Sequence, residues 1–214
     1  MKTLDPNETR EWVLNNRVAD RVEQLLKQNY TGYQLLRNDD TTGETDIPLQ
    51  KRTDAANQWK ADLYLSIHHN AGINGGKGGG IIAIVYTDPK NESVQWQQAF
   101  YDELIRQTGL KGNRAEPLTR QNLHEVRETV MPAVLLELGF MDSSVDVPII
   151  LTDKFADQCA NAIVHVIAQR AKLARKSGTD PLYRVQVGAF NQRQNAEALL
   201  KKLKDAGYSD AFIT

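Results

Sequence analysis

The stretch Pro132-Ala133-Val134-Leu135-Leu136-Glu137 decides the fold class of this chain. Its apolar residues run without interruption into a carboxylate, which is typical of a strand covered on both faces. A similar run covers residues 81–86, and a third, residues 63–68, ends at His68. We expect these three segments to form the centre of one sheet, and residues 33–37 to add a short strand.

The segments between these strands have the spacing of helices. Apolar side chains recur every three or four residues along 153–172, and residues 48–59 and 93–108 are also predicted to be helical. The first helix is predicted to begin at Asp5-Pro6-Asn7-Glu8, where the aspartate can cap it and the proline suits its first turn. Strands that alternate with helices predict an α/β fold, with a mostly parallel twisted sheet flanked by helices.

A polar stretch divides the chain into a large and a small region. Residues 1–172 are predicted to form the main domain, residues 173–181 a linker, and residues 182–214 a small second region. The small region has the pattern of a strand, a helix and the beginning of a second strand, at residues 183–190, 195–206 and 211–213.

Composition excludes several classes of protein. The 214 residues are 41% hydrophobic and carry a net charge of −1, whereas a general nucleic-acid binder usually has a basic excess. There is no run of about 18 apolar residues and no apolar leader, so we expect neither a membrane span nor a signal peptide. Cys159 is the single cysteine, which rules out an intrachain disulfide, and its apolar neighbours predict a buried thiol. The oligomeric state is left open.

Two groups that can bind a metal lie where the apolar pattern does not require them. Glu11 precedes Leu14 by three residues, at the head of a helical apolar stripe, and a carboxylate that faces a core is costly unless it is paired or binds a metal. His68 ends its strand, at the edge where ligands gather in α/β sheets, and imidazole is a common zinc ligand. His69 should face the opposite side of the strand. The alternatives for Glu11 are a solvent-facing position at a frayed helix start or a favourable interaction with the helix N-terminus. The alternative for His68 is a histidine that is only hydrogen-bonded.

Glu137 is the candidate for proton transfer. It closes its strand between two leucines, and such desolvation would raise its pKa. A group of this kind can take a proton from water and return it to a leaving amine. The alternative is a buried carboxylate paired with Arg127 or Arg52. His124 and His165 are expected to be peripheral.

Together these residues predict a zinc hydrolase. Glu11 and His68 would bind Zn²⁺, and Glu137 would be the catalytic acid/base. A catalytic zinc usually takes three protein ligands and a water, and spacing nominates only two.

Two stretches carry a resemblance to a known family. Ser66-Ile67-His68-His69-Asn70-Ala71 is similar to the zinc-histidine motif, and Met131-Pro132-Ala133-Val134-Leu135-Leu136-Glu137-Leu138-Gly139-Phe140-Met141 to the catalytic-glutamate motif, of zinc-dependent N-acetylmuramoyl-L-alanine amidases. These enzymes occur in autolysins, sporulation lysins and phage endolysins. Glu11 stands where the family has its zinc glutamate, and the matches run in the family's order over roughly residues 4–171. Five further residues match the segment before the histidine strand: Asp46, Leu49, Arg52, Ala56 and Asn57.

The resemblance implies a reaction, a partner and a location. It implies zinc-dependent cleavage of the amide between N-acetylmuramic acid and the L-alanine of the stem peptide, in cell-wall lysis or remodelling. Peptidoglycan is the implied partner and the extracellular cell wall the implied location, reached by lysis or through a segment outside this sequence. The family begins with a strand and a glycine-rich loop whose histidine is the first zinc ligand, and no histidine precedes His68 here. The N-terminal strand and the third ligand are therefore expected to be missing from this sequence.

The tail resembles a second family. Tyr183-Arg184-Val185-Gln186-Val187-Gly188-Ala189-Phe190, with Asn195-Ala196-Glu197 and Ala206-Gly207-Tyr208, is similar to the opening half of a SPOR domain. The resemblance implies a partial βαβ unit that binds glycan strands of peptidoglycan. A strand–helix–strand of about 30 residues is not expected to be stable alone, and the alternative is a docked or floppy extension.

Two other functions fit the same residues. A chain that lacks one zinc ligand could be a pseudoenzyme, which binds peptidoglycan without cutting it. Another zinc hydrolase on a related α/β scaffold, such as a carboxypeptidase, would need an arginine for a terminal carboxylate, and Arg114, Arg120 and Arg127 are available. The glycine-rich loop 75–80 is predicted to be flexible, and either shapes a substrate groove or only joins two strands.

Overall fold

The computed structural model describes residues 4–177, 187–208 and 211–213, and the chain divides into two compact units, Met1–Thr179 and Asp180–Thr214. The helices of the first unit are α1 (Glu11–Asn29), α2 (Leu49–Trp59), α3 (Asn91–Thr108), α4 (His124–Arg127), α5 (Val147–Ile150) and α6 (Asp153–Arg170). Its strands are β1 (Tyr30–Thr31), β2 (Tyr64–Asn70), β3 (Ile81–Val85), β4 (Leu118–Arg120), β5 (Ala133–Phe140) and β6 (Ala174–Arg175).

The centre of the first unit is a four-stranded sheet with the order β2-β5-β3-β4. The β2–β5 and β3–β4 pairings are parallel, and the β3–β5 pairing between them is antiparallel. The predicted α/β sheet flanked by helices is confirmed, and the antiparallel pairing makes the sheet mixed. In the β2–β5 register His68 lies opposite Glu137, so two candidate site residues are neighbours across the sheet.

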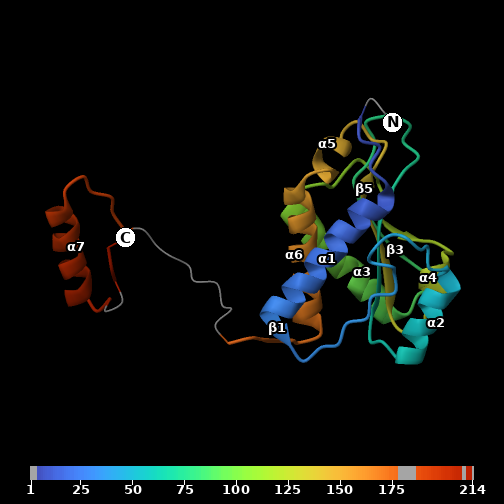
Figure 1. Ribbon diagram of the computed structural model, residues 1–214, viewed down its shortest axis with the longest axis horizontal. Helices are drawn as coiled ribbons and strands as arrows, with labels where there is room; N and C mark the ends of the chain where they lie inside the picture. The colour runs from blue at the N-terminus through green and yellow to red at the C-terminus, as the bar shows by residue number, and fades with distance from the viewer. Residues whose placement is uncertain (1–3, 178–186, 209–210, 214) are drawn as a thin grey trace. The chain divides into compact units, whose positions relative to one another are not determined.

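Helices cover both faces of this sheet (Figure 1). On one face Val134, Leu136 and Leu138 of β5 pack in a core with residues of α1, α3 and α6. On the other face Ala133 and Leu135 pack with residues from α2 and α4. Because strand side chains alternate, Glu137 faces the same side as the second set, toward α2 and α4.

The first helix confirms the predicted apolar stripe and corrects its beginning. Leu14, Val18 and Val22 are buried as predicted, but Leu26 completes the buried stripe in place of the predicted Leu25, which is only partly buried. The helix begins at Glu11, so the prediction that it begins at Asp5-Pro6-Asn7-Glu8 is wrong. The Asp5 carboxylate instead accepts the N–H groups of Asn7 and Thr9, a local turn that competes with helix formation.

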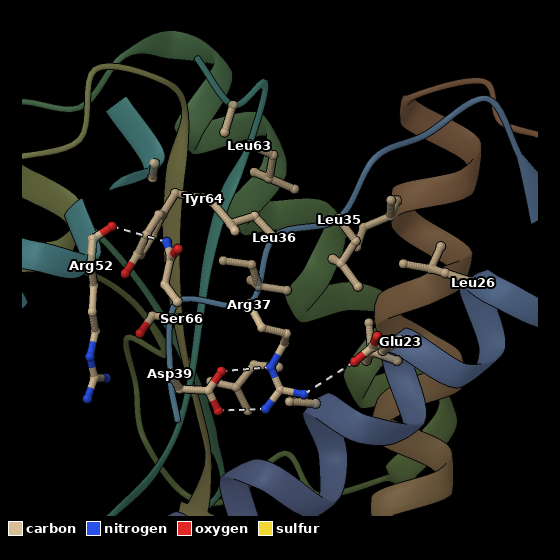
Figure 2. A pocket seen from close by; sticks show the side chains of 18 of the residues that line it. Glu23, Leu26, Leu35, Leu36, Arg37, Asp39, Arg52, Leu63, Tyr64 and Ser66 are labelled. Atoms are coloured by element: carbon tan, nitrogen blue, oxygen red, sulfur yellow. Dashed lines mark hydrogen bonds and ion pairs between the residues drawn. The ribbon is translucent and has the colours of Figure 1, made fainter. Parts of the chain in front are cut away.

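The outer edge of β2 borders a cavity of about 1030 Å³, enclosed by α1 and by the segment that precedes α2. Figure 2 shows Leu35 and Leu36 in its apolar part and Arg37 paired with Asp39 and Glu23 at a polar part. The predicted strand at residues 33–37 is absent, since this segment has no strand hydrogen bonds. Arg37 fixes the segment by ion pairs instead.

The end of the first unit also differs from the predicted linker. Ala174 and Arg175, which fall inside the predicted linker 173–181, form β6 and pair with β1. Residues 178–181 lie outside the described residues. In the described parts of the chain, no helix is long and apolar enough to cross a membrane.

The second unit contains α7 (Arg193–Asp205), which confirms the helix predicted at 195–206. Gly207 follows the end of α7 and has a positive φ of 98°, a conformation that favours glycine and is typical of the residue that ends a helix. Residues 187–190 and 211–213 are not in strands, and residues 183–186 of the predicted strand lie outside the described residues.

Candidate active site at β2 and β5

The three candidate residues reach one place from three elements. Glu11 is the first residue of α1, His68 lies on β2, and Glu137 lies opposite His68 on β5. Glu11 Oε1 is 2.8 Å from His68 Nδ1. Residues that lie far apart along the chain are therefore brought together near the carboxyl ends of two parallel strands.

Glu11 is held by hydrogen bonds rather than left in solvent. Its Oε1 atom accepts the side-chain N–H of Asn15 at 3.0 Å and the backbone N–H of His69 at 3.3 Å, in addition to its contact with His68. Burial would raise the pKa of Glu11, but the hydrogen bonds from His68 and Asn15 and the nearby imidazole lower it to about 2. Glu11 is thus ionised at neutral pH. Its side chain is 43% exposed, but its contacts with Asn15, His68 and His69 show that it is not frayed.

His68 and His69 have opposite surroundings. Burial would lower the pKa of His68, but the hydrogen bond and the charge of Glu11, followed by the charges of Glu137 and Glu125, raise it. His69 is 4% exposed, its Nδ1 lies 2.8 Å from Asn15 Oδ1, and burial lowers its pKa to about 4. The predicted alternation is confirmed, since His69 contacts α1 and supports Glu11 through Asn15.

Glu137 has a buried carboxyl oxygen without a partner. No described residue donates to its Oε2 atom. Burial raises its pKa to about 7, the His68 imidazole opposes that rise, and the charges of Glu11 and Glu125 add to it. The alternative of a structural ion pair is wrong, because Arg127 bonds Glu128 and Asn122.

The second arginine proposed for such a pair is also engaged elsewhere. Arg52 donates to the carboxylate of Asp46 and to the carbonyl oxygen of Ile47. Of the arginines proposed to hold a terminal carboxylate, Arg114 lies over the Phe140 ring with its Cζ 4.7 Å from the ring centroid.

Comparison with known proteins identifies the family of the chain. Residues 3–169 match the family described as N-acetylmuramoyl-L-alanine amidase. The chain belongs to this amidase family. Residues 154–214 match the SPOR domain, which confirms the resemblance of the tail.

Similar proteins and solved structures are also N-acetylmuramoyl-L-alanine amidases. It is 31% identical over 207 residues to the sporulation-specific N-acetylmuramoyl-L-alanine amidase of Bacillus subtilis, a match that covers 97% of this chain and 77% of that protein. The crystal structure of an N-acetylmuramoyl-L-alanine amidase from Clostridium difficile 630 superposes with a TM-score of 0.70 at 26% identity, over 78% of this chain and 87% of that chain. The catalytic domain of CwlV from Paenibacillus polymyxa has the same fold, with a TM-score of 0.69 at 24% identity, over 79% and 89% of the two chains.

Glu125 is a site residue of this amidase that sequence reasoning missed. It lies on the four-residue helix α4, its side chain is 8% exposed, and its Oε1 is 3.8 Å from His68 Nε2. A helix of one turn is too short to show periodicity, so no pattern in the sequence marks Glu125. His124 itself bonds Thr53 at 3.2 Å, and His165 is exposed on α6, so both are peripheral as predicted.

The donor set suits zinc in type but not in number. Glu11 and His68 offer an oxygen and a nitrogen in contact with each other, which are zinc-binding atoms. Among the residues that the structure describes, no group of three or more His, Cys, Asp or Glu side chains could hold a metal ion. The residues that the structure describes therefore supply two donors at this place, where a catalytic zinc usually has three.

The glycine-rich loop is anchored, which corrects the prediction that it is flexible. Asp146, 1% exposed, accepts the N–H groups of Gly80 and Phe140, and Ser144 donates to the carbonyl oxygen of Gly76. Gly79 is in a conformation that favours glycine (φ 152°), and an added Cβ would lie 2.2 Å from an Asp146 oxygen. The loop is a fixed connection beside the end of β5.

Proposed function

We propose that this chain hydrolyses the amide bond between N-acetylmuramic acid and the L-alanine of the peptidoglycan stem peptide, with Glu11 and His68 as zinc ligands and Glu137 as general acid/base. The observation that carries the proposal is the convergence of a carboxylate, an imidazole and an unpartnered buried carboxyl group. The amidase family of the chain supports the reaction.

A bound zinc ion would supply a water of lowered pKa and polarise the amide carbonyl group. Glu11 suits such an ion, because its carboxylate is ionised at neutral pH and its Oε1 is already oriented by Asn15 and His69. Glu11 and His68 are two ligands, so a third residue would have to supply the remaining one. The cavity that reaches Ser66 and His68 offers room on that side for a further donor.

Glu137 has the properties that proton transfer needs. With a pKa raised to about 7, it exchanges a proton with little bias near neutral pH. It can take a proton from the attacking water and return it to the leaving amine. Its unpartnered oxygen means that no protein donor has to be displaced before it does so.

The family and the SPOR match indicate a peptidoglycan ligand and an extracellular or cell-wall location. We propose further that both glycan strands and stem peptides are contacted, the former by the SPOR-like tail. We also propose that the protein reaches the wall by cell lysis or with a segment outside this sequence.

The test measures zinc content and release of L-alanine amino termini from purified peptidoglycan. We expect near-stoichiometric zinc and release from the chain, or from a version extended at its N-terminus by a histidine-bearing segment. Glu137→Ala should keep the zinc and lose the release. If both forms bind peptidoglycan but neither binds zinc nor releases L-alanine amino termini, the pseudoenzyme is favoured. This alternative is supported by the lack of a three-ligand group among the described residues.

A further inference from the structure

Arg114 is an exposed arginine that has no carboxylate partner among the described residues. Five other arginines of the first unit form ion pairs with aspartate or glutamate side chains: Arg21, Arg37, Arg52, Arg106 and Arg127. The guanidinium group of Arg114 instead lies over the Phe140 ring, with its Cζ 4.7 Å from the ring centroid. Glu116, two residues further along the chain, forms no ion pair with it in the described part of the structure. The N–H groups of this guanidinium are therefore left for a ligand.

A bulge in β5 places Phe140 on the same face of the sheet as Glu137. Between the His68–Glu137 pair and the Asn70–Phe140 pair, β5 advances by three residues while β2 advances by two. Phe140 accordingly packs in the core on the side of α2 and α4, which is the side that Glu137 faces. Arg114 thus covers the next position after Glu137 on this face.

The segment that carries Arg114 is fixed at the same end of the sheet. Asn113 accepts the N–H group of Gly79 through Oδ1 at 3.2 Å. Gly112 approaches Gly79 so closely that an added Cβ would lie 2.0 Å from the Gly79 carbonyl oxygen. The Leu110 carbonyl oxygen accepts the N–H group of the first residue of β3, which lies beside the end of β5. The backbone that carries Arg114 is therefore held beside the candidate active site.

The charges around the site favour a cation at this place when the substrate is an anion. Three glutamates lie around His68, and they repel a substrate carboxylate unless a fixed cation offsets them. Arg114 supplies a positive charge at the edge of the site, and Lys77 and Lys111 are exposed on the neighbouring segments. The glycan of the proposed substrate offers uncharged hydroxyl and acetamido groups, whereas its peptide carries carboxylates. The positive edge therefore indicates where the peptide lies.

We propose that Arg114 is a specificity-determining residue, which binds a free carboxylate of the stem peptide beyond the cleaved amide. The inference rests on the proposed amidase function and names the part of the substrate that is bound beside Phe140. Arginine suits this ligand, because its planar guanidinium group can donate two parallel N–H bonds to one carboxylate. The Phe140 ring beneath it supports the guanidinium by a cation–π contact while its N–H groups stay accessible.

The spacing along β5 indicates which carboxylate Arg114 reaches. Neighbouring positions on one face of a strand are about 7 Å apart. An extended peptide covers about 3.5 Å per residue. When the scissile amide lies at Glu137, a carboxylate on the residue after L-alanine therefore lies above Phe140, within reach of Arg114.

The test compares two disaccharide peptides that differ only at the residue after L-alanine, whose carboxyl group is free in one and amidated in the other. Their binding to the full metal-free chain is measured by isothermal titration calorimetry, so that no hydrolysis accompanies it. The wild type should bind the free carboxylate about 10- to 100-fold more tightly than the amide. Arg114→Met, which keeps an apolar cover on Phe140, should bind both peptides alike. Arg114→Lys should keep part of the preference, since it keeps the charge and loses the planar pair of donors.

The matched control is Arg120→Met, which removes an exposed arginine at the other end of the sheet, where Arg120 pairs with Val85. It should leave the preference for the free carboxylate unchanged. Equal binding of the two peptides by the wild type, or a preference that survives in Arg114→Met, would overturn the inference. Equal weakening of both peptides in Arg114→Met would give Arg114 a structural role and overturn it as well.

Release of L-alanine amino termini from purified peptidoglycan separates this inference from the proposed function. Release by the wild type without a preference for the free carboxylate would leave the amidase function standing and remove the role of Arg114. A preference that is lost in Arg114→Met, in a chain that releases nothing, would support the carboxylate site and overturn the hydrolysis.

Discussion

Glu137 in β5 is half-buried and Asp142 and Asp146, just after that strand, are buried, yet their carboxyl groups have opposite surroundings. Glu137 Oε2 has no partner among the described residues, and burial raises the pKa of the carboxyl group to about 7. Asp142 accepts the N–H groups of Gly72 and Asn74 through Oδ2, although its Oδ1, like Glu137 Oε2, has no partner among the described residues. Burial would raise the pKa of Asp142 as well, but those backbone hydrogen bonds lower it overall.

The difference teaches that donors, not burial, decide what a carboxylate does at this end of the sheet. Asp146 is 1% exposed and accepts two backbone N–H groups, so it stabilises the loop that crosses β5. Glu137 has no such donors, so its charged form is costly and its proton is available for chemistry. In the proposed function, the region of Glu137 serves the reaction, whereas the aspartate region holds the backbone in place.

The largest expected effect is a loss of amide hydrolysis when Glu137 is replaced. Glu137→Gln should lower the rate of amide hydrolysis by about 10³-fold, because an amide cannot carry the proton. Zinc content and the unfolding midpoint should not fall. The measurement is L-alanine release under saturating peptidoglycan.

Glu128→Gln is the matched control, since it makes the same change at an exposed carboxylate nearby. It should keep nearly full activity. Retention of more than a tenth of the activity by Glu137→Gln would remove Glu137 from the acid/base role.

The largest effect on stability is expected in the rigid region. Asp146→Ala should lower the free energy of unfolding by about 3 kcal/mol, because the N–H groups of Gly80 and Phe140 lose their acceptor in a buried place. Urea denaturation measures it. Asp153→Ala, which breaks an exposed ion pair with Arg21, should cost no more than about 1 kcal/mol. Equal losses in the two variants would mean that Asp146 does not anchor the loop.

The two regions should also respond to pH with opposite sign. The pKa of Glu137 is raised from 4.5 to about 7 in the folded state, so between these values the native state binds more protons than the unfolded state. Its contribution to stability therefore falls as pH rises through that window. In metal-free protein, the stability of Glu137→Gln relative to the wild type should rise by about 2–3 kcal/mol from pH 4.5 to pH 8. A difference that does not change with pH would contradict the raised pKa.

Asp142 gives the opposite case. Its pKa is lowered from 3.8 in the folded state, so its contribution is present above that value and is lost as pH falls through the folded pKa. Asp142→Asn should therefore be destabilised relative to the wild type at pH 6, and the gap should narrow toward pH 2. Chemical denaturation at several pH values measures both trends.

The smallest effect is expected for Ser143→Ala, which should lower the stability of the fold without changing amide hydrolysis. Ser143→Ala removes a hydroxyl that donates to the Gly78 carbonyl oxygen and accepts the N–H groups of Val145 and Asp146. We expect a loss of about 1 kcal/mol in unfolding free energy and unchanged hydrolysis. A loss of hydrolysis in Ser143→Ala would show that the rigid region also takes part in the reaction.

The sequence by itself determined the central strands, the long helices and the three candidate residues of the site. The uninterrupted apolar runs predicted β3 and β5, because strands covered on both faces need apolar side chains on both. Glu11, His68 and Glu137 stood out as polar groups at the ends of such patterns, and the structure brings them together. Their roles stay predictions until zinc and hydrolysis are measured.

Only the tertiary structure decided the rest. Glu125 reaches His68 because α2 fixes a helix of one turn, which is too short to leave a periodic signal. Asp142 and Asp146 anchor a loop that its sequence predicts to be flexible. Their partners include backbone N–H groups 70 and 66 residues away along the chain, and a pattern of side chains does not reveal such contacts. Local sequence sets which face a residue takes, and packing between distant segments sets whether a buried carboxylate finds its donors.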